Sequence, residues 1–134
     1  MNGPVLNDYG PEVARRFAEP RFSGSLPGAV AVTLRSRARD AEICFQALVD
    51  DRKRLKRLRF QAIGCPHLVA AADLLAERLE GAAVVDLQDF RAGFLETELP
   101  LPAEKLDLKI LLEDAIKALY QAILNESHPE EIAS

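Results

Sequence analysis

The sequence predicts an α+β domain in which helices pack on one face of a three-stranded antiparallel sheet and the last helix is long. Apolar and polar residues alternate with a period of two in three segments between residues 29 and 63. From residue 66 to residue 125, apolar residues instead recur at helical spacing. Strands that come first and helices that follow are the order of an α+β fold.

A short helix is predicted before the sheet. It runs from Pro11 to Ala18, begins with proline at its first position and ends before Pro20. The three segments that follow each have one apolar face, which is typical of an antiparallel sheet covered on one side. Their expected bounds are residues 29–35, 41–49 and 54–63. The short connections between them suit hairpins.

The second half of the chain predicts three helices. The first, from Pro66 to Glu80, starts with proline and stops at Gly81, a residue type that favours helix ends. A shorter helix is expected over residues 84–92, and an extended link over residues 99–102. A long final helix is expected from about Asp107 to Asn125, because its leucines and alanines fall at helical spacing.

The composition fits one globular domain. With 134 residues, 49% of them hydrophobic, we expect a single domain over residues 1–134, with a core at about 9–124 and a flexible tail at 125–134.

No run approaches the roughly 18 apolar residues of a membrane helix, and no secretory signal pattern is present. Two cysteines are too few for a disulfide framework, so we expect a cytoplasmic protein. No catalytic triad, phosphate loop or paired-carboxylate pattern is visible, which argues against an enzyme.

Six of the eight residues from Arg52 to Arg59 are cationic, although the net charge of the chain is −4. This basic run is either a solvated strand face or a docking patch for an acidic protein partner, with Arg54, Arg57 and Arg59 as candidate contacts. Nucleic acid is the least favoured partner, because no aromatic residues alternate with the cations to stack on bases.

Several segments of the chain follow one known pattern in order and spacing. They are Phe17 to Arg21 with Gly24, Val49 to Asp51, Leu58 to Cys65, and Leu111 to Ala118. From about Tyr9 to Ala122 the sequence therefore resembles the family of iron–sulfur cluster assembly scaffolds formed by IscU and the N-terminal domain of NifU. The resemblance implies the same α+β fold and a role in iron–sulfur cluster assembly.

The resemblance implies a cluster site with three cysteines, of which this chain keeps only Cys65. The first family cysteine falls at Ala38 or Arg39, next to Asp40, which matches an aspartate of the family motif. The third falls in a family His-Cys pair that reads Asp107-Leu108 here. The family's chaperone-recognition motif is kept only at its ends, which argues against a chaperone partner.

The resemblance also implies a reduced ligand set. Cys65, Asp40 and Asp107 would offer one sulfur and two oxygens, with His67 as a weaker candidate. This set suits a loosely held ferrous ion, or zinc in its place, better than a stable iron–sulfur cluster, because cluster iron prefers thiolates. Lys105 matches a family lysine near the site.

Each of these residues also has a structural interpretation. Cys65 lies at a predicted helix N-terminus, which favours a thiolate that could accept sulfur, or it simply fills space. Asp40 suits a hairpin turn, and Asp107 suits the N-cap of the last helix. His67 and Lys105 suit exposed positions with no specific role.

Two functional hypotheses follow. The first is a divergent scaffold that binds iron or accepts sulfur through Cys65 and docks on a cysteine desulfurase. A second subunit, either its own copy or another scaffold, would complete the coordination. The alternative is a metal-free interaction or regulatory module that docks on a desulfurase or another sulfur-transfer partner.

Overall fold

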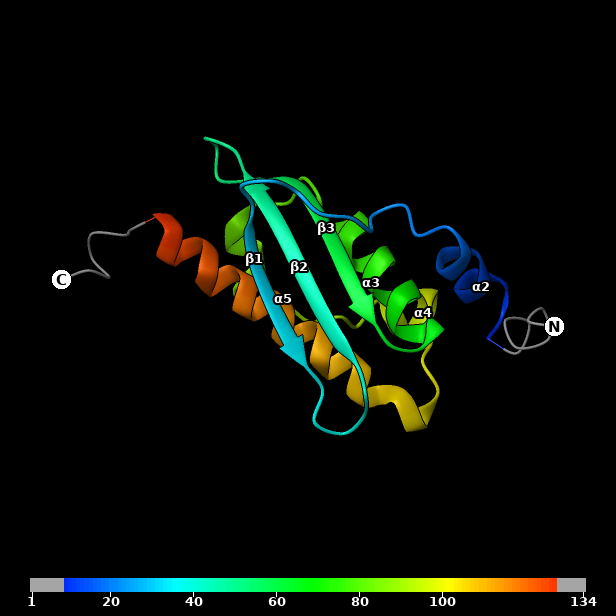
Figure 1. Ribbon diagram of the computed structural model, residues 1–134. Coiled ribbons are helices and arrows are strands. Elements are labelled where there is room, and N and C mark those ends of the chain that lie inside the picture. The colour runs from blue at the N-terminus through cyan, green and yellow to red at the C-terminus, as the bar shows by residue number, and fades with distance from the viewer. Residues whose placement is uncertain (1–8, 128–134) are drawn as a thin grey trace.

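The computed structural model describes residues 9–127, in which one three-stranded sheet lies against a layer of helices (Figure 1). In chain order the elements are α2 (Pro11–Ala18), β1 (Val30–Arg35), β2 (Glu42–Val49), β3 (Leu55–Ile63), α3 (Pro66–Leu79), the 3₁₀ helix η1 (Val84–Leu87), α4 (Leu95–Glu98), the 3₁₀ helix η2 (Ala103–Lys105) and α5 (Leu106–Ser127). The predicted α+β class, the antiparallel sheet and the long last helix are confirmed.

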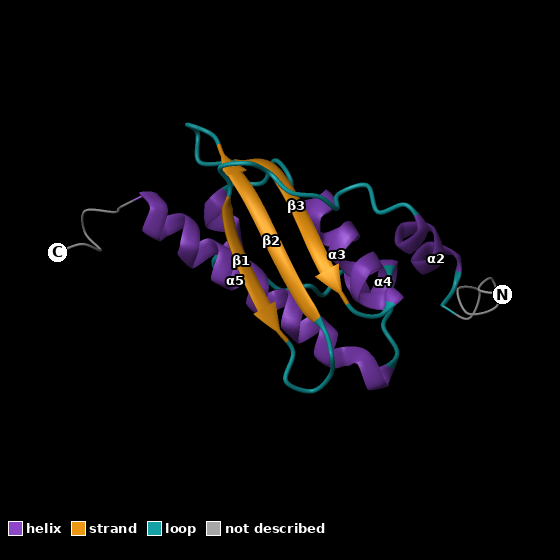
Figure 2. Ribbon diagram, in the orientation of Figure 1, coloured by secondary structure: helices purple, strands orange, loops and turns teal. Residues whose placement is uncertain are grey.

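β2 is the central strand of the sheet and pairs antiparallel with both neighbours. Phe45 of β2 lies opposite Val32 on one side and opposite Phe60 on the other. The inner face of β2 and β3 is buried, as the period-two pattern predicted; its side chains include Ile43, Phe45, Ala47, Leu58 and Phe60. Two long helices cover this face, with α3 against β3 and α5 against β1 and β2 (Figure 2).

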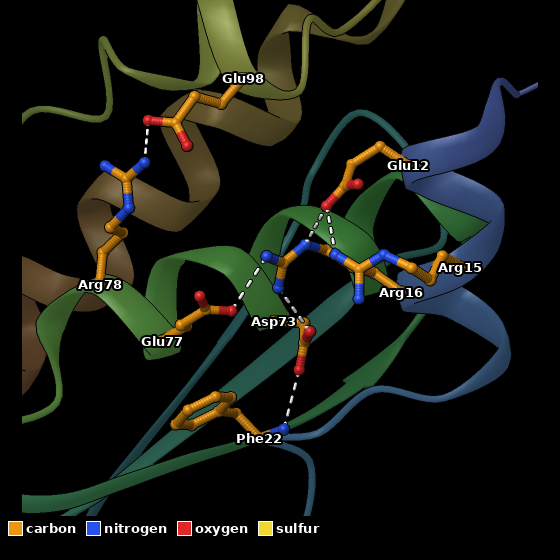
Figure 3. A network of polar contacts seen from close by, with 8 residues as sticks. All are labelled: Glu12, Arg15, Arg16, Phe22, Asp73, Glu77, Arg78 and Glu98. Atoms are coloured by element: carbon orange, nitrogen blue, oxygen red, sulfur yellow. Dashed lines mark hydrogen bonds and ion pairs between the residues drawn. The ribbon is translucent and has the colours of Figure 1, made fainter.

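α3 is buried on nearly all sides, whereas the sequence predicted a single apolar stripe. The sheet covers one side of α3 and α2 covers another, so its polar Asp73 is also buried, with 1% of its surface exposed. Arg16 of α2 donates to Asp73 at 2.7 Å and forms ion pairs with Glu12 and Glu77 (Figure 3). The second Asp73 oxygen accepts the N–H of Phe22 at 2.8 Å. This cluster ties α2, α3 and the following loop together.

The helix expected over residues 84–92 is wrong in extent, because only η1 forms there. Val84 and Leu87 of η1 are buried, and so is Phe90 beyond its end. Burial therefore recurs every three residues, which matches a 3₁₀ turn and not an α-helix. Further along this segment, the N–H of Ala92 donates to the Glu113 carboxylate of α5 at 2.7 Å.

The last helix, α5, is slightly longer than predicted. α5 continues through residues 125–127, where we expected the tail to begin, and residues 128–134 lie outside the described residues. None of the helices within residues 9–127 combines the length and the apolar character that crossing a membrane requires.

Candidate functional site

Cys65 lies where β3 passes into α3. It is the N-cap residue of α3, and its carbonyl oxygen accepts the N–H groups of Leu68 and Val69 at 3.0 and 3.3 Å. Gly64 permits the tight connection, because a Cβ at that position would lie 2.9 Å from a methyl carbon of Leu68. The backbone therefore holds a free, half-buried thiol at the N-terminal end of α3, where the helix dipole attracts negative charge.

Asp107 lies in the first turn of α5 and forms a two-point ion pair with Arg39 of the β1–β2 connection. The Arg39 Nε and Nη2 atoms donate to its two carboxylate oxygens at 2.8 and 2.7 Å. Nη2 also donates to the carbonyl oxygen of Glu104 at 2.7 Å. These hydrogen bonds hold the pKa of Asp107 below its usual value. Hydrogen bonds to Asp107 also raise the pKa of Arg39.

His67 is buried on the first turn of α3, which corrects the expectation of an exposed side chain. Its Nδ1 atom lies 3.2 Å from Nζ of Lys105. The Tyr9 ring packs edge-on against the imidazole with ring centroids 4.6 Å apart, and the Lys105 ammonium lies 5.1 Å from the Tyr9 centroid. Burial, followed by the charge of Lys105, lowers the pKa of His67. A neutral imidazole with an unprotonated Nδ1 atom can therefore accept a hydrogen bond from the Lys105 ammonium.

Asp40 is exposed and has no hydrogen bond or ion pair to any other residue between 9 and 127. Its charge acts on Arg35 of β1 and helps to raise the pKa of that arginine, after the contacts with Glu42. Across the described part of the chain, no three His, Cys, Asp or Glu side chains gather into a group that could hold a metal ion. The fold thus joins Asp107 to Arg39, and within residues 9–127 no hydrogen bond or ion pair joins Asp40 or the Cys65 thiol to this pair.

An open hollow of about 480 Å³ lies beside this ion pair, between the end of β1 and the first turns of α5. Its lining carries side chains of both charges together with apolar side chains. The lining residues include Arg35, Arg37, Asp107, Ile110, Leu111 and Asp114. Asp107 is therefore accessible from the side of α5.

Two of the three candidate docking arginines make contacts within the domain. Arg59 pairs with Glu80 at 2.6 Å and packs over the Phe22 ring at 5.1 Å. Arg54 donates to the carbonyl oxygen of Gly81 at 3.2 Å. Arg57 is exposed and has no such contact to another residue within 9–127.

Comparison with known proteins decides the family. The family described as "NifU-like N terminal domain" matches residues 8–126. The chain belongs to the NifU-like N-terminal domain family. A relative from Drosophila melanogaster, the iron-sulfur cluster assembly enzyme IscU, is 30% identical over 115 residues, which cover 82% of this chain and 74% of that protein. The resemblance inferred from the sequence is confirmed.

Other matches extend this result. The IscU scaffold protein of Rickettsia prowazekii is 34% identical over 73 residues, which cover 54% of this chain. The chain spans 56% of the length of that protein. The crystal structure of a NifU-like protein (N-terminal) from Brucella abortus matches 90% of this chain and 97% of its own, with a TM-score of 0.69 and 14% identity. At this identity the match shows the NifU-like N-terminal domain fold alone.

Sequence reasoning missed the partners that this member of the NifU-like N-terminal domain family places around its site. Arg39 was considered only as a replacement for a lost cysteine, although it binds a residue 68 positions away. The contact of Tyr9 with His67 was also not foreseen. No local signal predicts either contact. The first depends on how α5 packs against the sheet, and the second on how the segment that leads into α2 packs against α3.

Proposed function

We propose that this chain acts in iron–sulfur cluster assembly as a divergent scaffold that offers a single thiolate, Cys65. The observation that carries the proposal is the place of this thiol, which is free and half-buried at the start of α3. The names of the relatives as iron–sulfur cluster assembly proteins support it. Iron and sulfur are the cargo of such a protein.

The residues do not form a ready three-ligand pocket for this cargo. A [2Fe–2S] cluster is usually held by four cysteines, and this chain contributes one at the family position. Asp107 and Asp40 are the candidate oxygen ligands for iron or for zinc in its place, and His67 is a weaker one. Both oxygens of Asp107 are bound by Arg39, and His67 is bound by Lys105. A second subunit, either another copy or another scaffold, would supply the missing thiolates.

The sulfur donor in this proposal is a cysteine desulfurase. Sulfur would pass when the Cys65 thiolate attacks the terminal sulfur of a donor persulfide: a new sulfur–sulfur bond forms at Cys65, and the donor cysteine leaves as a thiolate. Exposed cations of the β2–β3 hairpin, including Arg57 and Lys56, would dock on an acidic surface of the donor. Both cysteines are free thiols, which suits a reducing cytoplasm.

Anaerobic reconstitution with ferrous iron and sulfide tests the proposal. Iron and sulfide are counted per chain for the wild type, Cys65→Ala and the control Cys44→Ala, which removes the half-buried thiol of β2. We expect bound iron and sulfide in the wild type and in Cys44→Ala, and their loss in Cys65→Ala. Equal loading of all three proteins would refute the role of Cys65. No loading of any protein, with desulfurase binding weakened by Arg57→Glu, would favour the metal-free alternative.

A further inference from the structure

The outer edge of β3 is covered by two other segments of the chain. Phe60 exchanges backbone hydrogen bonds with Phe22 and Gly24, at 3.0 and 2.9 Å. Leu55 exchanges two more with residues 81 and 82, at 2.7 and 2.8 Å. An uncovered edge strand can pair with another chain, and proteins usually protect such edges. The edge at β3 is therefore protected at two places along its length.

The outer edge of β1 has no such cover within residues 9–127. The N–H of Ser36 donates to the carbonyl oxygen of Ala41 at 2.9 Å, and hydrogen-bonded pairs alternate along an antiparallel ladder. The backbone groups of Ala31, Thr33 and Arg35 therefore point away from β2, and none of them bonds to another segment of the described chain. β1 contains no proline, and its register with β2 is unbroken. The strand thus offers a row of free backbone donors and acceptors.

α5 forms the second wall of a groove along this edge. It packs against β1, and Figure 1 shows its last turns projecting beyond that strand. The open hollow of about 480 Å³ lies between the two elements, with Leu34 on one side and Ile110 on the other. Ile110 is 58% exposed, and Leu34 is only half-buried, although its cross-strand neighbour Ile43 is fully buried. A strand added to β1 would remove apolar surface of both side chains from water.

The groove carries two unpaired charges of opposite sign. Arg37 and Asp114 both line the hollow, and neither forms a hydrogen bond or ion pair with another residue within 9–127. The other charged residues of the lining, Arg35 and Asp107, are already paired within the domain. α5 begins beside the β1–β2 connection and runs back under the sheet, so Asp114 lies further along the groove than Arg37.

We propose that the edge of β1 and the adjoining face of α5 bind an extended segment of a partner protein, which adds as a strand antiparallel to β1. Its backbone pairs with the free groups of β1, and an apolar side chain enters the hollow against Ile110. An acidic residue near its N-terminal end faces Arg37, and a basic residue nearer its C-terminal end faces Asp114. In strand addition, main-chain hydrogen bonds give affinity and side-chain pockets give specificity.

A second copy of the whole domain suits this edge less well than a single strand. The turns of α5 that project beyond β1 would meet the helix layer of the other copy (Figure 1). The Cys65 thiol does not line the hollow, so the inference is independent of the proposed function.

Fluorescence anisotropy with a labelled synthetic peptide provides the test. The probe alternates valine and threonine and carries one glutamate near its N-terminus and one lysine near its C-terminus. The variants are Thr33→Pro, which removes an outward N–H of the edge strand, Ile110→Ser and Asp114→Asn. Ile63→Ser is the matched control, because Ile63 is 64% exposed but lies on β3, outside the lining of the hollow. Thermal melts confirm that each variant is folded.

We expect Thr33→Pro and Ile110→Ser each to weaken binding of the probe about tenfold, because the first loses a backbone hydrogen bond and the second an apolar contact. Asp114→Asn should weaken it only about threefold, because the ion pair is exposed. Ile63→Ser should bind the probe as the wild type does. If the proline variant does not fold, N-methylation of the probe at alternate residues replaces it. One of the two alternating sets should abolish binding and the other should spare it, since only one set faces β1.

Three results would overturn the inference. The first is a wild type that does not bind the probe, or binding that Ile110→Ser and Asp114→Asn leave unchanged. The second is an equal effect of the two N-methylated sets. The third is a wild-type dimer in analytical ultracentrifugation that Thr33→Pro abolishes, which would assign the edge to a second copy. Iron loading through Cys65 is measured separately, so none of these results decides the proposed function.

Discussion

Asp73 of α3 should be among the most sensitive positions of the fold, because it is a charge buried with a single cation. Replacement by alanine removes the carboxylate that binds Arg16 at 2.7 Å and leaves the Phe22 N–H without its acceptor. Breaking a buried ion pair by removing one partner costs about 3–5 kcal/mol. Arg16 keeps two other carboxylates, Glu12 and Glu77, so we expect the lower end, about 3 kcal/mol.

Two variants separate the contributions to this loss. Asp73→Asn keeps an oxygen that can accept the Phe22 N–H but removes the charge, so its cost should be about half that of alanine, roughly 1.5 kcal/mol. Glu77→Gln serves as the control, because its side chain is 45% exposed and binds the same arginine. An ion pair with such an exposed partner contributes about 0–1 kcal/mol.

Urea unfolding followed by circular dichroism measures these differences in the free energy of unfolding. For a chain of this size a loss of 3 kcal/mol also lowers the melting temperature by roughly 10 °C. The midpoint should fall in the order wild type, Glu77→Gln, Asp73→Asn, Asp73→Ala. If Asp73→Ala loses less than about 1 kcal/mol, or no more than Glu77→Gln, burial does not set the strength of this contact.

Two further predictions concern the turn and the pH response. Gly64→Ala should lower the free energy of unfolding by about 1–3 kcal/mol, because its new Cβ would lie 2.9 Å from Leu68. Gly93→Ala is the control and should cost far less, because a Cβ there would meet open space. Similar urea midpoints for the two variants would contradict this prediction. Because the pKa of His67 is lowered in the folded state, its neutral form contributes stability that is complete above the unfolded pKa and is lost as the pH falls towards the folded pKa. The free energy of unfolding should therefore fall from about pH 7.5 to pH 5.5, and less so in His67→Gln; parallel pH profiles would refute this contribution.

Local sequence signals were sufficient for the elements around the site. Pro66 and the alternating strand before it place the start of α3, and the apolar spacing of α5 places Leu108 in the core, where it is fully buried. The prediction was weakest for residues 84–92. Over so short a segment, the three-residue apolar spacing of a 3₁₀ helix is hard to distinguish from the three-to-four-residue spacing of an α-helix.

The sequence by itself determined the class of fold, the strand order and the position of a lone thiol at the entry to a helix, because these follow from periodicity and from glycine and proline placed along the chain. Only the tertiary structure decided which partners the other candidate residues have. Asp107 meets Arg39 because α5 packs across the sheet, and Lys105 meets His67 of α3. A contact between distant segments leaves no periodic trace in the sequence. Whether a carboxylate faces a metal or an arginine is a property of that packing and not of the residue type.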